Sequence, residues 1–260
     1  FAFSIFTAPK SDNKVLSEFE KAFVKPNLTH ENFKGFSYRK LTFVKDTLLP
    51  TIVFVHGTIG SCLDFKAYIK DSLLANKANF IAYDRVGYNY KDKNNVQESI
   101  AFETSLLQNI THSLNKKYTI LIGYSYGGPI VLADNNLYKK TILLAPAVYS
   151  KVEPMPWMIS LYNWKITRWL VPEIWKQASK EKLSHKEDLL KFEENWKFNP
   201  NKIISIHGDD DGIVPHSNSE YLRTQFSKNQ FKLITIPNVG HGLVWSEFDF
   251  IKQQILNNLD

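Results

Sequence analysis

One serine, held between a buried strand and a helix, constrains the fold of this chain more than any other feature. Residues 118–128 read YTILIGYSYGG, and their first half has the apolar, β-branched composition of a strand that is covered on both faces. A serine that follows such a strand and opens a helix sits on a sharp, strained turn, so glycines must flank it. Ser125 lies between Gly123 and Gly127 at that spacing. The pattern predicts Ser125 as a nucleophile whose hydroxyl projects at the start of a helix.

From about Phe36 onward, short apolar runs alternate with longer amphipathic stretches, which is typical of βα units that build a parallel sheet. The predicted strands are residues 36–44, 51–55, 79–83, 118–122, 140–145, 202–207 and 231–236. The predicted helices are residues 64–75, 99–114, 126–136, 216–226 and 245–259. We therefore expect an α/β fold with a mostly parallel central sheet and helices on both faces.

The longest interruption of this alternation runs from Pro146 to Pro200, where the sequence becomes helix-like. It carries Trp157, Trp164, Trp169, Trp175 and Trp196. A lid inserted between two strands would have this pattern. The length of 260 residues fits one domain, which we divide into an N-terminal extension (1–35), a core (36–145 and 201–260) and a helical lid (146–200).

Composition excludes several classes of function. The formal net charge is +6, but Lys and Arg are scattered and form no recognition-helix or zinc-finger pattern, so we expect no nucleic-acid partner. No metal-ligand constellation and no dinucleotide-type glycine motif is visible, so we expect neither a metal nor a cofactor. A small molecule is the expected partner, and no stable protein partner is predicted.

The compartment stays open at this stage. Cys62 is the single cysteine and cannot form an intramolecular disulfide. No stretch reaches the length of a membrane span. Residues 1–6 (FAFSIF) are apolar and do not begin with methionine. They are either the remnant of an N-terminal signal or membrane anchor, or an ordinary segment that docks on the surface. A cytoplasmic and an exported or membrane-anchored protein are both compatible with the sequence.

A serine hydroxyl needs a base to remove its proton, and in such folds the order along the chain is Ser, acid, His. Of the histidines after Ser125, His241 lies in a flexible Gly-His-Gly turn between the last predicted strand and the last predicted helix. A side chain there can reach the serine. We therefore predict His241 as the general base.

The acid should follow a late strand and precede His241. The segment 206–215 (IHGDDDGIVP) offers Asp209, Asp210 and Asp211, and three acids cannot all be buried beside one imidazole. At this point the sequence resembles the α/β-hydrolase superfamily, in which Gly, two variable residues and then the catalytic Asp precede a Val-Pro pair. Counting from Gly208, the resemblance selects Asp211.

The same resemblance implies an oxyanion hole. Residues 53–60 (VFVHGTIG) are similar to the His-Gly loop of the superfamily, which implies backbone donors at Thr58 and at Tyr126, the residue after the nucleophile. His56 would support this turn and move no proton. Residues 83–87 (YDRVG) are similar to the Asp-Arg-x-Gly loop, but Asn89 and Lys91 replace its later Gly and Ser. Tyr124 stands where many members carry His.

Serine as nucleophile argues against the dehalogenase and epoxide hydrolase branches, which the resemblance implies would carry aspartate there. We expect a carboxylesterase-like serine hydrolase that acts through an acyl-enzyme at Ser125. Alternatives are a C–C bond hydrolase, a thioesterase, a peptidase, an acyltransferase or a non-catalytic ligand-binding member. Trp157 and Trp164 have the spacing of one helical face. They are candidate substrate contacts, although packing of the lid on the core is the simpler explanation.

Overall fold

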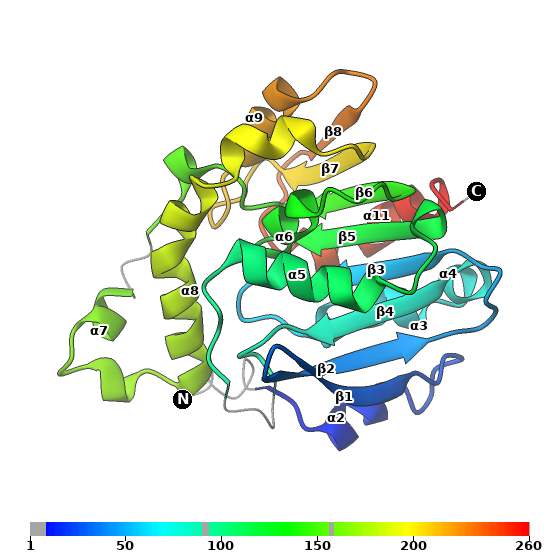
Figure 1. Ribbon diagram of the computed structural model, residues 1–260, viewed down its shortest axis with the longest axis horizontal. Helices are drawn as coiled ribbons and strands as arrows, with labels where there is room; N and C mark the ends of the chain where they lie inside the picture. Colours follow the sequence, from blue (N-terminus) through cyan, green and yellow to red (C-terminus); the bar gives the residue numbers. More distant parts are fainter. Residues whose placement is uncertain (1–8, 90–93, 156–158, 260) are drawn as a thin grey trace.

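A computed structural model describes residues 9–89, 94–155 and 159–259. Its centre is an eight-stranded sheet with the strand order β1-β2-β4-β3-β5-β6-β7-β8 (Figure 1). The first two strands pair antiparallel with each other, and β2 pairs antiparallel with β4. All other neighbours are parallel. The strands are β1 (Asn27–Phe33), β2 (Phe36–Phe43), β3 (Thr51–Val55), β4 (Asn79–Asp84), β5 (Thr119–Tyr124), β6 (Lys140–Leu144), β7 (Ile203–Gly208) and β8 (Phe231–Ile236).

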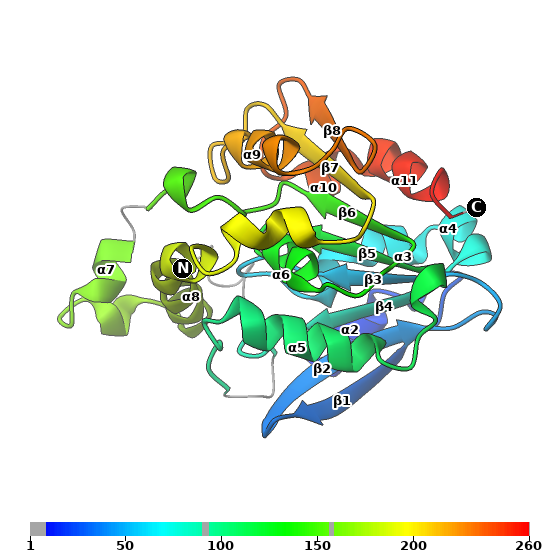
Figure 2. The same cartoon turned by 45° about the horizontal axis from the view of Figure 1, so that its top comes forward.

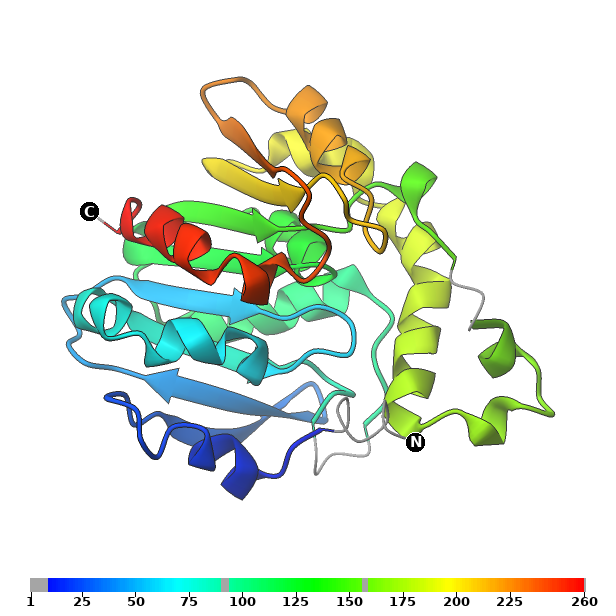
Figure 3. The same cartoon turned by 180° about the vertical axis from the view of Figure 1, so that it is seen from behind.

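Helices cover both faces of this sheet. On one face lie α5 (Ile100–Thr111), α6 (Gly127–Ala133) and α9 (Ser217–Gln225). On the other lie α3 (Lys66–Lys70), α4 (Ser72–Lys77), α10 (Leu243–Ser246) and α11 (Phe248–Leu256), as Figure 3 shows from behind. The short α2 (Asp12–Ser17) adds Val15 to the core on this second side. Because both faces are covered, β4 and β5 are buried along their whole length.

The predicted fold class is confirmed, and a strand is present at each of the seven predicted positions. The sequence pattern missed β1, which we had placed in an N-terminal extension. Its sequence, NLTHENF, is polar because it is an edge strand with no buried residue. The predicted helices 64–75 and 245–259 are each interrupted, and each forms separate short helices.

The segment between β6 and β7 is largely helical. It contains η3 (Ser150–Val152), α7 (Ile159–Asn163), η4 (Arg168–Leu170), α8 (Glu173–Leu189) and η5 (Glu193–Phe198). The long helix α8 runs across the carboxyl ends of the parallel strands, as seen from the front and from behind (Figures 1 and 3). This places the inserted segment at the edge of the sheet where loops after β3, β5, β7 and β8 also meet.

Candidate active site

Ser125 occupies a strained turn between β5 and α6. Its φ is 53°, a left-handed conformation that is uncommon for a residue with a side chain. The close packing of the turn explains the flanking glycines. A Cβ on Gly123 would lie 2.4 Å from the carbonyl oxygen of Gly127, and a Cβ on Gly127 would lie 2.1 Å from that of Val55. The turn therefore requires the residue types that the sequence pattern recognised.

The three residues predicted as a triad are brought together from three different loops. The Nε2 atom of His241 lies 3.0 Å from Oγ of Ser125, and its Nδ1 lies 2.8 Å from Oδ2 of Asp211. Because a carboxylate only accepts, Nδ1 carries the hydrogen and Nε2 presents a lone pair to the serine hydroxyl. This is the tautomer that a general base requires.

The acidic cluster resolves into one buried and two exposed side chains. Asp211 is buried, and its Oδ1 accepts hydrogen bonds from the backbone amides of Ile213 and Val214. Asp209 and Asp210 are exposed. Asp209 accepts from the backbone amide of Asn238 in the neighbouring turn. Of the three acids, only Asp211 contacts His241.

A second histidine, His207, touches the same carboxylate. Its Nε2 lies 2.9 Å from the carbonyl oxygen of Val214 and 3.3 Å from Oδ2 of Asp211. Its Nδ1 lies 2.7 Å from the hydroxyl of Ser219, which donates to it. Burial acts to raise the pKa of Asp211, but hydrogen bonds from His207 and His241 outweigh it and hold that pKa below its ordinary value. His207 is the last residue of the predicted strand 202–207, and no sequence pattern marks it as a partner of Asp211.

The loop after β3 lies directly beside the serine. A Cβ on Gly57 would be 2.7 Å from Cβ of Ser125, so the backbone of this loop packs tightly against the serine. Thr58 is the next residue of the loop. His56 fixes the loop: its Nδ1 donates to the carbonyl of Gly57 at 2.7 Å, and its Nε2 accepts from the amide of Arg85 at 2.9 Å. Burial and the nearby guanidinium of Arg85 lower the pKa of His56 well below its ordinary value, which keeps it neutral. These contacts agree with a supporting part for His56. Of the predicted oxyanion donors, the amide of Thr58 belongs to this loop and that of Tyr126 to the residue after the serine, and their role stays a prediction.

A buried carboxylate from the inserted segment holds this loop in place. Glu181, on α8, accepts from both terminal nitrogens of Arg85 at 2.7 and 3.0 Å. It also accepts from the hydroxyls of Thr58 at 2.7 Å and Tyr88 at 2.8 Å. Burial acts to raise the pKa of Glu181, yet attraction and hydrogen bonding by Arg85 dominate, and the pKa is lowered. The sequence contained Arg85 within a recognised motif, but no pattern marked Glu181 as its partner.

The turn that carries His241 is supported from the residue before the nucleophile. The hydroxyl of Tyr124 donates to the carbonyl oxygen of His241 at 3.0 Å, and the two rings stack with centroids 5.1 Å apart. Trp245 packs edge-on against the same tyrosine. Tyr124, noted in the sequence as a departure from the superfamily, therefore positions the predicted base.

The other predicted residues lie apart from this cluster or beyond the described chain. Trp164 is largely exposed on the turn after α7, and its contact with substrate stays a prediction. Trp157 and residues 1–6 lie outside the described residues. Cys62 is buried, and burial raises the pKa of its thiol well above the ordinary value. Cys62 packs in the hydrophobic core.

Comparison with known proteins identifies the fold. Residues 50–133 match the family model described as the alpha/beta hydrolase fold. This match spans the predicted oxyanion loop, the Asp-Arg-x-Gly loop and the serine turn. No curated protein matches the chain significantly in sequence.

Solved structures extend the likeness to nearly the whole chain. An α/β-hydrolase enzyme, MGS-M2, from a Medee basin deep-sea metagenome library is 15% identical with a TM-score of 0.69, over 88% of this chain and 96% of its own. The naproxen esterase of Bacillus subtilis is 16% identical with a TM-score of 0.67, over 96% and 99%. A meta-cleavage product hydrolase from Pseudomonas fluorescens is 16% identical with a TM-score of 0.62, over 88% and 96%. The chain has the α/β-hydrolase fold, and the predicted resemblance is confirmed at that level.

Proposed function

We propose that this protein is a serine hydrolase that cleaves carboxylic esters through an acyl-enzyme on Ser125. The observation that carries the proposal is the unbroken line of contacts from Asp211 through His241 to the hydroxyl of Ser125. Its two heavy-atom distances are within hydrogen-bonding range, which is the geometry that activation of a weak nucleophile demands. The esterase and C–C bond hydrolase among the structural matches share only the fold with this chain.

In the proposed reaction, Oγ of Ser125 attacks the ester carbonyl carbon while its proton passes to Nε2 of His241. The carbonyl π electrons move to oxygen, and that oxyanion accepts hydrogen bonds from the amides of Thr58 and Tyr126. When the tetrahedral intermediate collapses, the C–O bond to the alcohol breaks and His241 returns the proton to the leaving alcohol. Water then attacks the acyl carbon and gives a proton to His241. When the second tetrahedral intermediate collapses, the bond from the acyl carbon to Oγ of Ser125 breaks, Oγ takes the proton back from His241, and the carboxylic acid leaves.

Asp211 has a supporting part in this scheme. It accepts the hydrogen on Nδ1 of His241, which fixes the imidazole orientation and stabilises the imidazolium that forms in each half-reaction. Its depressed pKa keeps it ionised throughout. His207 contributes a second contact to the same carboxylate oxygen, Oδ2 of Asp211.

The test is hydrolysis of a panel of acyl esters by the wild-type protein and by Ser125→Ala. We expect the variant to lose activity by about a millionfold in kcat while it keeps its fold. Ser105→Ala, which alters a half-buried serine on α5 whose hydroxyl donates to the carbonyl of Ala101 in the same helix, is the matched control and should behave as wild type. Near-normal ester turnover by Ser125→Ala would remove Ser125 from the mechanism. If the wild type cleaves substrates of C–C bond hydrolases faster than every ester in the panel, C–C bond hydrolysis becomes the favoured function.

A further inference from the structure

The turn that joins α7 to α8 exposes an unusual set of apolar side chains. Trp164 is 70% exposed, Ile166 is 81%, Trp169 is 75% and Leu170 is 62%. We call residues 159–172 the tip. Isolated exposed apolar residues are ordinary on protein surfaces, but four large ones within seven positions form a patch that marks an interaction site.

Hydrogen bonds hold the tip in a defined shape. The amides of Thr167 and Arg168 both donate to the carbonyl of Trp164, and the hydroxyl of Thr167 donates to that of Leu161. Nε of Arg168 donates to the carbonyl of Tyr162, while its guanidinium lies 4.6 Å from the centroid of the same ring. Tyr162 and Ile159 are buried. Some apolar side chains of the tip therefore face inward, and the four exposed ones are presented outward.

The charge of the tip has one sign. Residues 159–172 (ISLYNWKITRWLVP) contain Lys165 and Arg168 and no Asp or Glu. Lys165 is exposed. Tryptophan and bulky aliphatic side chains interleaved with cations suit the interface of a bilayer that contains anionic lipids, because the apolar groups enter the acyl boundary and the cations meet the headgroups.

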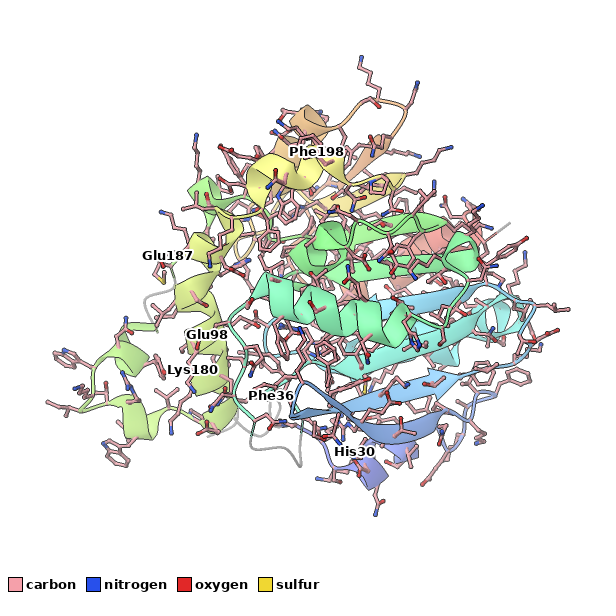
Figure 4. The ribbon with its side chains drawn as sticks, in the orientation of Figure 1. His30, Phe36, Glu98, Lys180, Glu187 and Phe198 are labelled. Carbon is pink, nitrogen blue, oxygen red and sulfur yellow. The ribbon has the colours of Figure 1, made fainter. Side chains whose placement is uncertain are left out.

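The tip lies on the same side of the molecule as the carboxyl ends of the parallel strands. Figures 1 and 2 show α7 and the following turn beyond α8, at the end of the molecule farthest from the sheet. In Figure 4, α8, marked by Lys180 and Glu187, lies between the sheet and the tip. The carboxyl ends of the parallel strands, which carry Ser125, point toward this same end. A membrane that contacts the tip would therefore face the active-site side of the sheet.

We propose that the tip inserts into the surface of an anionic phospholipid bilayer and that the substrates of the enzyme are esters of lipids in that bilayer. The second half of this proposal rests on the proposed function. Within the described residues no helix has the length and apolar character to cross a membrane. A second copy of the chain is a less suitable occupant, since a twofold contact through the tip would bring Lys165 and Arg168 together with no carboxylate in the segment to compensate.

The test uses vesicles of phosphatidylcholine mixed with phosphatidylglycerol, and vesicles of phosphatidylcholine alone, in a sedimentation assay with the full chain. We expect the wild type to bind the mixed vesicles more tightly. Ile166→Ser combined with Trp169→Ser should weaken that binding by roughly tenfold or more per side chain, since a fully buried large apolar group is worth more than one factor of ten. Lys165→Glu should abolish the preference for phosphatidylglycerol. Leu48→Ser is the matched control, because Leu48 is 84% exposed just before β3, at the opposite edge of the sheet.

Activity separates the two halves of the proposal. On a water-soluble short-chain ester, the tip variants should match wild type, whereas on a lipid ester in mixed vesicles they should be slower in proportion to lost binding. Vesicle binding that ignores the tip substitutions would overturn the inference. So would a dimer that these substitutions dissociate without any vesicle binding by the wild type. If the tip substitutions weaken vesicle binding but the wild type hydrolyses no ester, the membrane contact is supported and the proposed function is refuted.

Discussion

At the scale of single residues, Asp211 differs from its two acidic neighbours in what surrounds it. It is buried and contacts His241, whereas Asp209 and Asp210 face solvent. We expect Asp211→Asn to reduce kcat by about 10⁴, because the amide would favour the wrong imidazole tautomer. Asp209→Asn and Asp210→Asn are internal controls and should leave kcat nearly unchanged. A crippling effect of Asp209→Asn with a mild effect of Asp211→Asn would show that the register of the acid is wrong.

The contact between His207 and Asp211 makes a prediction about stability and pH. Because the pKa of Asp211 is depressed in the folded protein, its ionisation stabilises the fold above the unfolded pKa, about 3.9, and this contribution is lost as the pH falls below that range. His207→Phe removes one of the hydrogen bonds that depress the pKa. Asp211 of this variant should therefore take up its proton at a higher pH than in wild type, and we expect the free energy of unfolding, measured with urea, to fall less between pH 4 and pH 2 in the variant than in wild type.

Ser219→Ala is the matched control for that experiment. It removes the partner of Nδ1 of His207 without touching Asp211. The control should keep the pH dependence of wild type even if it is less stable at every pH. An unchanged pH dependence in His207→Phe would mean that His207 does not hold the carboxylate.

At the scale of secondary-structure elements, α8 is joined to the loop after β3 by Glu181. We expect Glu181→Gln to lower the free energy of unfolding by about 3 kcal/mol, because it removes the closer of the two buried carboxylates beside Arg85 and leaves only that of Glu103, 3.6 Å away. Thr58 is also bound to Glu181, so kcat should fall in the fraction that remains folded. Glu187→Gln, on the exposed face of the same helix, should change neither quantity. A free energy of unfolding equal to that of wild type in Glu181→Gln would show that the hydrogen bonds of Glu181 do not stabilise the fold.

Elements with a strong local pattern could be predicted from the sequence, and those that depend on distant partners could not. The buried strands and the serine turn carry their own signals, namely β-branched apolar runs and glycines at positions where a Cβ would clash. The polar edge strand β1 has no such signal, since none of its residues is buried. In the sequence, Glu181 is one of several acidic residues on an amphipathic helix. Only the folded chain brings Arg85 into contact with it, so the sequence could not identify the pair.

At the scale of the whole molecule, the parallel sheet explains how residues far apart in sequence meet. The loops after β3, β5, β7 and β8 emerge at the same edge and carry Gly57, Ser125, Asp211 and His241. The superfamily resemblance had selected Asp211 from three candidates, and the structure places only that acid beside the histidine. The exposure of Trp164 and its neighbours could not be predicted, because whether a tryptophan is buried or exposed depends on which other elements pack against it, and the local sequence does not contain that information.

The central claim is that Ser125 forms an acyl-enzyme, and mass spectrometry of the protein before and after digestion tests it most directly. The protein is mixed with an activated ester, quenched in acid within the turnover time and digested. The account predicts one added acyl group, located on the peptide that contains Ser125, and no adduct in Ser125→Ala. Hydrolysis of the ester with the acyl group on another residue, or an equal adduct on the Ser125→Ala protein, would contradict it.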